Sequence, residues 1–176
     1  MDTESKIDNF PKANDGFTLI EMLVYVGIFS IVVSAIVAFM QLMTQSRINN
    51  QIVLEVNDQG AQVVRVITQA IRNSSGINSP ATSTTASSLS INTTLASTTP
   101  TVFSLVSGVL YKTEGANPSL ALTNNKVSAS NLQFTNLSRS STPGTARFSF
   151  TLSDNITSAQ AQYNFSSIFY GSASLR

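Results

Sequence analysis

The sequence predicts an α+β fold in which one long N-terminal helix packs on a small antiparallel β-sheet domain. The stretch from Met22 to Met43 is almost entirely apolar. As a helix rising roughly 1.5 Å per residue, it is long enough to cross the hydrocarbon core of a bilayer. Apolar residues then recur with helical spacing from Ile48 to Ile71. Beyond Asn73 the chain is rich in Ser, Thr and Asn and contains short alternating apolar pairs, a pattern typical of half-buried strands.

The first part of this helix is predicted to be a single transmembrane segment. Its polar interruptions are Tyr25, Ser30, Ser34 and Gln41. Three other interpretations stay open: a secretory signal peptide cut near Val33-Ser34-Ala35, a plain signal anchor, and the buried helix of a soluble domain. The apolar run is longer than the core of a signal peptide, and the flanking sequence supplies no apolar partner helix for the third.

The helix is predicted to continue beyond the membrane, from Phe17 to about Arg72. No proline interrupts the chain between Pro11 and Pro80. An apolar stripe with a period near 3.6 residues is expected to cover the domain's own sheet. Its members are Ile48, Ile52, Val56, Val63, Ile67 and Ile71. The turn at residues 57–60 is the weakest, since Asn, Asp and Gly are poor helix formers, and residues 73–76 are expected to end the helix.

The remaining sequence predicts an antiparallel sheet with one solvated face. The alternating pairs are Leu89/Ile91, Phe103/Leu105, Val109/Tyr111, Leu120/Leu122, Leu132/Phe134 and Phe148/Phe150/Leu152. Residues 106–109 predict a two-residue hairpin and Pro143-Gly144 a turn. The pair Leu89/Ile91 argues for a strand inside the Ser/Thr-rich stretch 81–101. The stretch from Tyr163 to Tyr170 is open between an edge strand and a covering segment.

Composition excludes several classes of function. The chain contains no Cys, His or Trp, which removes thiol catalysis, disulfides and the usual ligands of zinc, iron and copper. Beyond the helix the only acids are Glu114 and Asp154, so we expect no enzyme, no cofactor and no metal. A calcium site at Asp154 and Asn155 lacks the several carboxylates that such sites collect. A net charge of +1 leaves no nucleic-acid site evident.

A carboxylate at the start of the apolar segment is the main functional candidate. The sequence Gly16-Phe17-Thr18-Leu19-Ile20-Glu21 precedes the run, and no further charge occurs until Arg47. An ionised Glu in hydrocarbon costs roughly 2.5 kcal/mol or more, so Glu21 needs a charged partner. A short hydrophilic leader ending in Gly, an aromatic residue, Thr-Leu-Ile, Glu and an apolar helix closely resemble the N-terminus of type IV prepilins and type II secretion pseudopilins.

The resemblance implies that this is a class III signal. A prepilin peptidase would cut between Gly16 and Phe17 and methylate the new amine of Phe17, and Glu21 would guide assembly. The new amine would lie within one helical turn of Glu21, close enough to pair with it. The amine of an adjacent subunit is the alternative partner, and such a pairing would fix the axial register of a fibre.

The resemblance also implies an organisation and a set of partners. The chain would consist of a cleaved leader (1–16), a transmembrane and polymerisation helix (17–43), an amphipathic helix continuing into the globular domain (44–73) and a Ser/Thr-rich antiparallel β domain (74–176). Its partners would be prepilin peptidase, other pilin or pseudopilin subunits, an inner-membrane assembly platform and the lipid bilayer. The precursor would cross the bacterial cytoplasmic membrane once, and its extracytoplasmic domain would join a surface or periplasm-spanning filament.

Outside residues 16–43 the resemblance is looser and is to minor pilins and J-type pseudopilins. The chain has neither the mid-helix proline nor the C-terminal disulfide frequent in major pilins. The leader departs from the family habit, since Lys12 rather than the residue before Gly16 is its nearest cation. Charge does not decide the orientation, because Lys6 and Lys12 on one side face Arg47 and Arg65 on the other. The alternative function is a monomeric, membrane-anchored surface binding domain.

Overall fold

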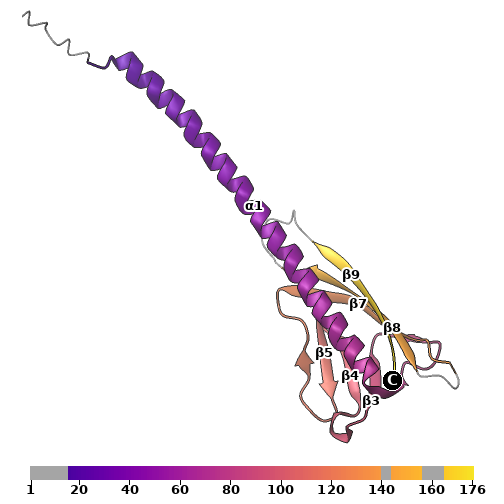
Figure 1. The fold of residues 1–176 in the computed structure, drawn as a ribbon. Coiled ribbons are helices and arrows are strands. Elements are labelled where there is room, and N and C mark those ends of the chain that lie inside the picture. The colour runs from indigo at the N-terminus through magenta and orange to yellow at the C-terminus, as the bar shows by residue number, and fades with distance from the viewer. Residues whose placement is uncertain (1–15, 140–143, 156–164) are drawn as a thin grey trace, which may run out of the picture. The chain divides into compact units, whose positions relative to one another are not determined.

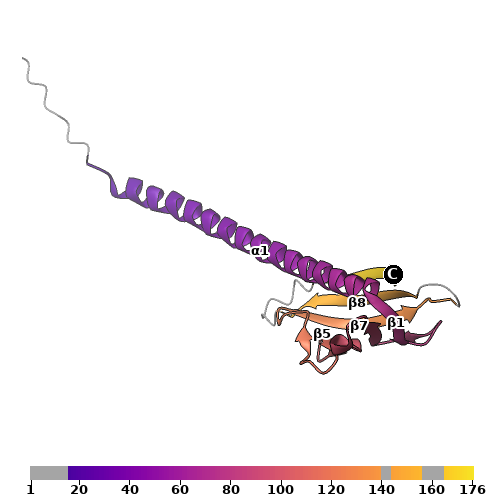
Figure 2. The same cartoon turned by 60° about the horizontal axis from the view of Figure 1, so that its bottom comes forward.

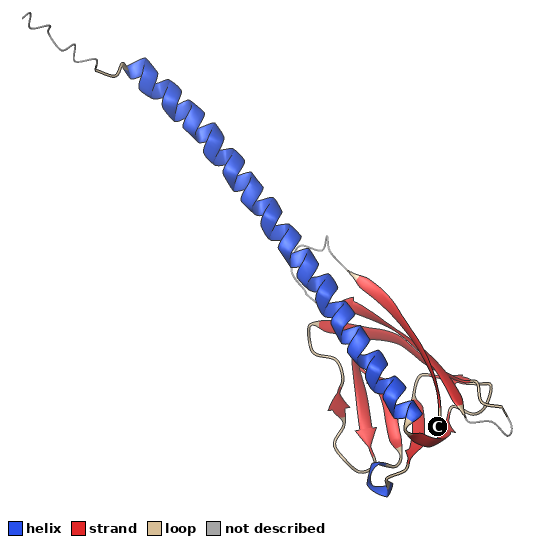
Figure 3. Cartoon of the chain, viewed as in Figure 1, coloured by secondary structure: helices blue, strands red, loops and turns tan. Residues whose placement is uncertain are grey.

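The structure is a computed structural model that describes residues 16–139, 144–155 and 165–176. Its described residues form one helix, α1 (Leu19–Arg72), followed by strands and one 3-10 turn, η1 (Ala96–Thr98) (Figures 1 and 3). The strands are β1 (Ser74–Ser79), β2 (Thr85–Ala86), β3 (Leu89–Thr93), β4 (Thr101–Val106), β5 (Val109–Glu114), β6 (Leu120–Ala121), β7 (Val127–Asn136), β8 (Thr145–Asp154) and β9 (Ser166–Ser174). The chain divides into two compact units, one ending at Ser46 and one running from Arg47 to Arg176.

In the first unit, α1 has no tertiary partner among the described residues. Every described side chain from Phe17 to Thr44 is exposed except that of Glu21, which is half-buried. By length and composition the stretch Leu19–Thr44 can cross a membrane. Two of its hydroxyls are satisfied within the helix, because Ser30 Oγ donates to the Val26 carbonyl at 2.8 Å and Thr44 Oγ1 donates to the Met40 carbonyl at 2.9 Å. Such internal bonds let hydroxyls sit in an apolar helix.

In the second unit, the helix buries the predicted apolar stripe against the strands. The buried members are Ile52, Val56, Val63, Ile67 and Ile71, whereas the side chain of Ile48 lies outside the described part. The turned view shows the helix lying over β7 and β8 (Figure 2). The prediction that this stripe covers the domain's own strands is therefore confirmed, and the helix ends at Arg72 as expected.

The strands form two antiparallel sheets, whereas the sequence predicted one. The first sheet has the order β1-β3-β4-β5-β6 and the second β2-β7-β8-β9. Both contribute to a single core around the helix stripe. The buried strand residues of this core include Leu89, Ile91, Phe103, Leu110, Phe134, Phe148, Phe150 and Leu152. The α+β fold class is confirmed, but alternation along a strand does not reveal which strands pair, because pairing depends on residues far apart in the sequence.

The predicted hairpin joins β4 to β5 and fixes which face of β5 is buried. Val106 pairs with Val109, and the intervening Ser107 and Gly108 have positive φ of 49° and 79°, as a tight type I′ hairpin requires. In this register Leu110 lies opposite Leu105 and is buried. The prediction that Val109 and Tyr111 face the core is thus wrong. Leu120 of the pair Leu120/Leu122 is also exposed.

The weakest predicted turn of the helix is a close-packing point. The helix continues through Gly60, which is buried and lies directly against the ring of Phe169 in β9. A β-carbon at this position would occupy the space of that ring, so a residue that is poor for helix propensity is favourable for packing here. The Phe169 ring in turn stacks on Phe150 with centroids 5.4 Å apart.

The last strand settles the open prediction for the C-terminal stretch. Residues Ser166–Ser174 form β9, which pairs with β8 along its whole length and is the edge strand of the second sheet. The earlier part of that stretch, residues 163–164, and Pro143 of the predicted Pro143-Gly144 turn lie outside the described residues.

Candidate functional site

Gly16 and Phe17 lie ahead of the helix in a solvent-exposed segment. The Phe17 side chain is 71% exposed. A β-carbon built on Gly16 meets no atom within 4 Å, and the backbone of this residue is not in the left-handed region. Nothing in the described part of the fold therefore requires glycine at position 16. The residue type is explained better by what approaches this segment from outside than by the fold itself.

Thr18 caps the N-terminus of the helix by accepting a hydrogen bond from the Glu21 amide. The Glu21 amide lies 3.3 Å from Thr18 Oγ1 and 3.1 Å from the Thr18 carbonyl oxygen. A hydroxyl that accepts from an amide three residues later satisfies one of the unpaired N–H groups at a helix start. The spacing Thr-x-x-Glu is that of a capping box. This signal was present in the sequence, although it was not used there to place the first turn.

Glu21 has a hydrogen-bond partner that the sequence analysis missed. Tyr25 Oη donates to Glu21 Oε1 at 3.1 Å, one helical turn away. The Tyr25 ring also meets the Phe17 ring edge-on, with centroids 6.4 Å apart and an interplanar angle of 73°. Tyr25 was treated only as a polar interruption of the apolar run. Its spacing of four residues from Glu21 was the signal, because such pairs meet on one helix face.

The arrangement can hold an anion at the helix start but does not neutralise it. An ionised carboxylate offers about four lone-pair sites, and Tyr25 fills one of them on Oε1. The partial positive charge of the helix N-terminus contributes ~0.3 to 1 kcal/mol. Against a burial cost of roughly 2.5 kcal/mol or more in hydrocarbon, a cation is still needed. Glu21 makes no ion pair within the described part of the chain.

Glu55 and Glu114 of the second unit take part in structural contacts. Asn124 Nδ2 donates to Glu55 Oε1 at 2.8 Å, Gln59 Nε2 donates to the same oxygen at 3.1 Å, and Lys126 Nζ lies 3.6 Å from Oε2. The hydrogen bonds from Asn124 and Gln59 and the charge of Lys126 lower the pKa of Glu55, against a smaller opposing effect of burial. This network ties the 122–126 loop to the helix. Glu114 pairs with Lys112.

The two residues considered for calcium are not joined by further acids. Asn155 Nδ2 donates to the Asn125 carbonyl at 3.0 Å, and the Asn155 amide donates to the Lys126 carbonyl at 2.9 Å. Asn155 thus joins the β8 end to the loop before β7. No cluster of three or more Asp, Glu, His or Cys side chains occurs among the described residues.

The N-terminus of the chain is similar to a known protein family. Residues 11–37 match the family model of the prokaryotic N-terminal methylation motif. This match supports a type IV pilin-like precursor. No curated protein and no solved structure matches the chain.

The match bears on the class of protein and its location. Pilin-type proteins with this motif are structural subunits rather than enzymes. The motif implies processing by prepilin peptidase and assembly with other pilins. Together with the apolar stretch Leu19–Thr44, it fits a precursor anchored in the membrane by a single span.

Proposed function

We propose that the chain is a minor pilin-like or pseudopilin subunit that assembles through its N-terminal helix into a type IV pilus or a type II secretion-like filament. Prepilin peptidase cuts between Gly16 and Phe17 and methylates the amine of Phe17. Residues 17–43 then form the polymerisation helix, residues 44–73 the amphipathic helix, and residues 74–176 the β domain. An inner-membrane assembly platform draws the subunit out of the cytoplasmic membrane into a surface or periplasm-spanning filament.

The observation that carries this proposal is a methylation motif joined to a helix with no partner of its own. Residues 11–37 match the motif, and the described apolar side chains from Phe17 to Met43 are all exposed. Neighbouring helices in a fibre would cover this surface when it leaves the lipid. The alternative, a monomeric membrane-anchored surface binding domain, explains the apolar helix but gives no role to the motif.

In this proposal the charge of Glu21 fixes the axial position of the subunit in the fibre. Its carboxylate keeps the hydrogen bond from Tyr25, and the methylated amine of Phe17, from the same or a neighbouring subunit, supplies the missing cation. A neighbour that is shifted along the fibre axis would leave both charges unpaired in an apolar surrounding. Leaving one member of a buried pair alone costs about 3 to 5 kcal/mol, enough to select one register.

The variant Glu21→Leu tests this role. Removing the carboxylate eases membrane insertion by about 2.5 kcal/mol or more, so cleavage and membrane residence should persist. Incorporation into sheared fibres should be lost, as measured by immunoblot of the fibre and membrane fractions. Gln41→Leu is the matched control, since it also removes a polar side chain from the apolar segment, and it should assemble. Wild-type incorporation of Glu21→Leu would refute the assembly role.

A further inference from the structure

Among the described strands, the two sheets end in four edges, and only the edge of β9 lacks the strand features that protect an edge. Strands β2 and β6 have two residues each, and the pairing of β1 is irregular in two places. Strand β9 has nine residues, pairs with β8 without a register shift, and contains neither a charged residue nor proline. Proteins usually protect edges with short strands, bulges, charges or proline, because a free edge pairs with another chain. Within the described part of the chain, no strand pairs with the second side of β9.

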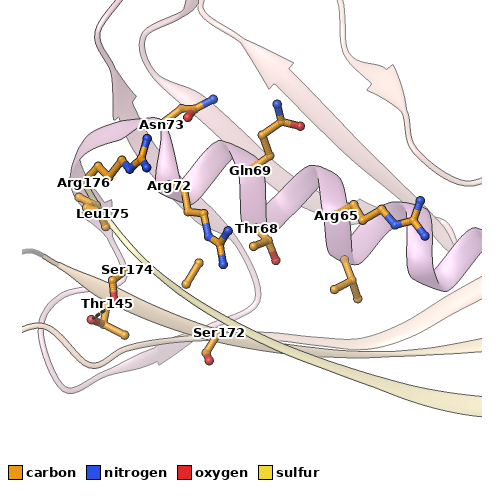
Figure 4. Close-up of a pocket in the computed structure, with 12 residues that line it drawn as sticks. Arg65, Thr68, Gln69, Arg72, Asn73, Thr145, Ser172, Ser174, Leu175 and Arg176 are labelled. Atoms are coloured by element: carbon orange, nitrogen blue, oxygen red, sulfur yellow. Dashed lines mark hydrogen bonds between the residues drawn. The ribbon is translucent and has the colours of Figure 1, made fainter.

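A groove lies between this strand and the helix. Its volume is ≈ 1010 Å³, and it is lined by the last turns of α1 and by the C-terminal half of β9 (Figure 4). The helix contributes Val64, Thr68 and Gln69. The strand contributes Ser172, Ala173 and Ser174. The groove therefore offers backbone groups of the strand on one side and a mixed apolar and polar helix surface on the other.

The charged side chains that line the groove are all positive among the described residues. Arg65, Arg72 and Arg176 line it, and no acidic side chain from the described part of the chain does. None of the three makes an ion pair with a described residue. Figure 4 shows the Arg72 side chain extending from the helix toward the strand. Arg65 and Arg72 are about 10 Å apart along the helix axis. Carboxylates two or four residues apart on an extended strand, roughly 7 or 13 Å, lie within reach of both long side chains.

The outward face of β9 carries apolar side chains that an added strand would cover. Ile168 is 56% exposed and Tyr170 is 68% exposed, while the intervening Phe169 points toward Gly60 of the helix. A strand paired with β9 would place alternate side chains beside Ile168 and Tyr170 and the others toward the helix. Aromatic and β-branched pairs across strands stabilise a sheet by about 0.2 to 1 kcal/mol each.

We propose that the free edge of β9 and the adjoining arginine-lined groove bind an extended, acidic segment of a partner protein, which adds to the second sheet as a fifth strand. The backbone of the segment pairs with β9, its carboxylates face Arg65 and Arg72, and its alternate β-branched residues cover Ile168 and Tyr170. Strand addition of this kind takes its affinity from main-chain hydrogen bonds and its specificity from alternate side chains. The site lies wholly within residues 47–176, so it does not depend on how the N-terminus is processed.

Two other ligands, a nucleic acid and a second copy of this chain, explain fewer of these observations. A nucleic acid would satisfy the arginines, but the groove is lined by no aromatic side chain on which a base could stack, and it would leave the β9 edge unpaired. A second copy of this chain would satisfy the edge through β9, but in a symmetric pair the same arginines would approach one another.

The test uses the full chain in detergent micelles and a fluorescein-labelled octapeptide in which Glu alternates with Val and Thr. Fluorescence anisotropy should show saturable binding. The double variant Arg65→Glu/Arg72→Glu should weaken binding about tenfold, since exposed charge pairs contribute up to about 1 kcal/mol each. The control Arg47→Glu reverses a charge at an exposed position outside the groove and should leave binding within about twofold. Far-UV circular dichroism should be the same for all three proteins.

Three further probes separate pairing from simple attraction of charge. A peptide of the same sequence with N-methyl groups on alternate amides should lose binding, because it keeps its charges but cannot extend the ladder. A peptide with Lys in place of Glu should not bind. Equal binding of the N-methylated peptide, or no binding of the acidic peptide, would overturn the proposal. So would arginine-dependent binding of a DNA duplex in place of the peptide, or dimerisation of the chain that blocks the peptide.

Discussion

The two units of this chain treat apolar side chains in opposite ways. Up to Ser46, apolar residues occur on every face of α1, and all those described are exposed. From Arg47 onward an apolar stripe runs along one face of the helix, and its described members are buried against two sheets, whereas Leu54 on another face is exposed. The same secondary structure thus serves two surroundings. An apolar pattern without period means that the partner of the helix must come from outside the chain, and an apolar pattern with helical period means that it lies within it.

The largest expected effect concerns the entry to the first unit. Gly16→Leu should abolish leader removal, because the peptidase must fit an extended backbone at the cut and a large side chain would obstruct it. Gly27→Leu is the matched control, since a β-carbon at either position meets no atom within 4 Å, and it should be cleaved normally. Immunoblots from cells that carry the peptidase would show the precursor alone for the first variant. Normal loss of the leader there would place the cut elsewhere.

The buried stripe of the second unit should respond strongly to truncation, and the exposed face of the same helix should not. Residues 45–176 are expected to form a soluble, folded monomer once the apolar segment is removed. In that fragment Ile67→Ala should lower the free energy of unfolding by about 2 to 5 kcal/mol, because Ile67 is 1% exposed. Leu54→Ala, at a position 62% exposed, should change it by less than about 0.5 kcal/mol.

Chemical denaturation followed by circular dichroism measures both values. Equal effects of the two substitutions would mean that the helix does not pack on the sheets through the stripe. An unfolded parent fragment would mean that the second unit depends on the first.

The smallest expected effect concerns the link between helix and loop at Glu55. Because its pKa is lowered in the folded state, the charged form stabilises the fold above the unfolded pKa, and this stability is lost as pH falls through the folded value. Glu55 is partly exposed, so we expect this interaction to contribute at most about 1 kcal/mol to the free energy of unfolding.

Glu55→Gln should reduce the loss of stability between about pH 6 and pH 3, as measured by denaturation at several pH values. Asn124→Ala should act in the same direction because it removes the strongest donor. Parallel pH profiles for all three proteins would contradict this account.

Much of the helix was predictable because its determinants are local. Its stripe, its end at Arg72 and the Gly16–Glu21 motif follow from spacing along one element. The inward position of Leu110 was also within reach, since a two-residue hairpin at 106–109 with Phe103 and Leu105 inward requires it. The prediction for this strand was wrong because each strand was considered alone, and the pairing of residues across the turn was not used.

Other features depend on residues that are distant in the sequence and so left no local signal. The division into two sheets and the bond from Asn124 to Glu55, 69 residues away, belong to this group. Gly60 shows a different limit: helix propensity describes its cost in a helix, but the ring of Phe169 that it accommodates comes from the last strand. At the candidate site, Tyr25 was visible as a residue four positions after Glu21, yet its role depends on the side-chain hydrogen bond that the structure shows.

The central claim is that the first unit is processed for assembly, and the intact mass of the protein extracted from its native membrane tests it most directly. The account predicts a chain that has lost residues 1–16 and gained one methyl group on the amine of Phe17. A chain that retains its leader would support the membrane-anchored binding domain instead, and a chain that begins at Ile36 would show that a signal peptidase had cut after Val33-Ser34-Ala35. Either result would contradict the proposed function.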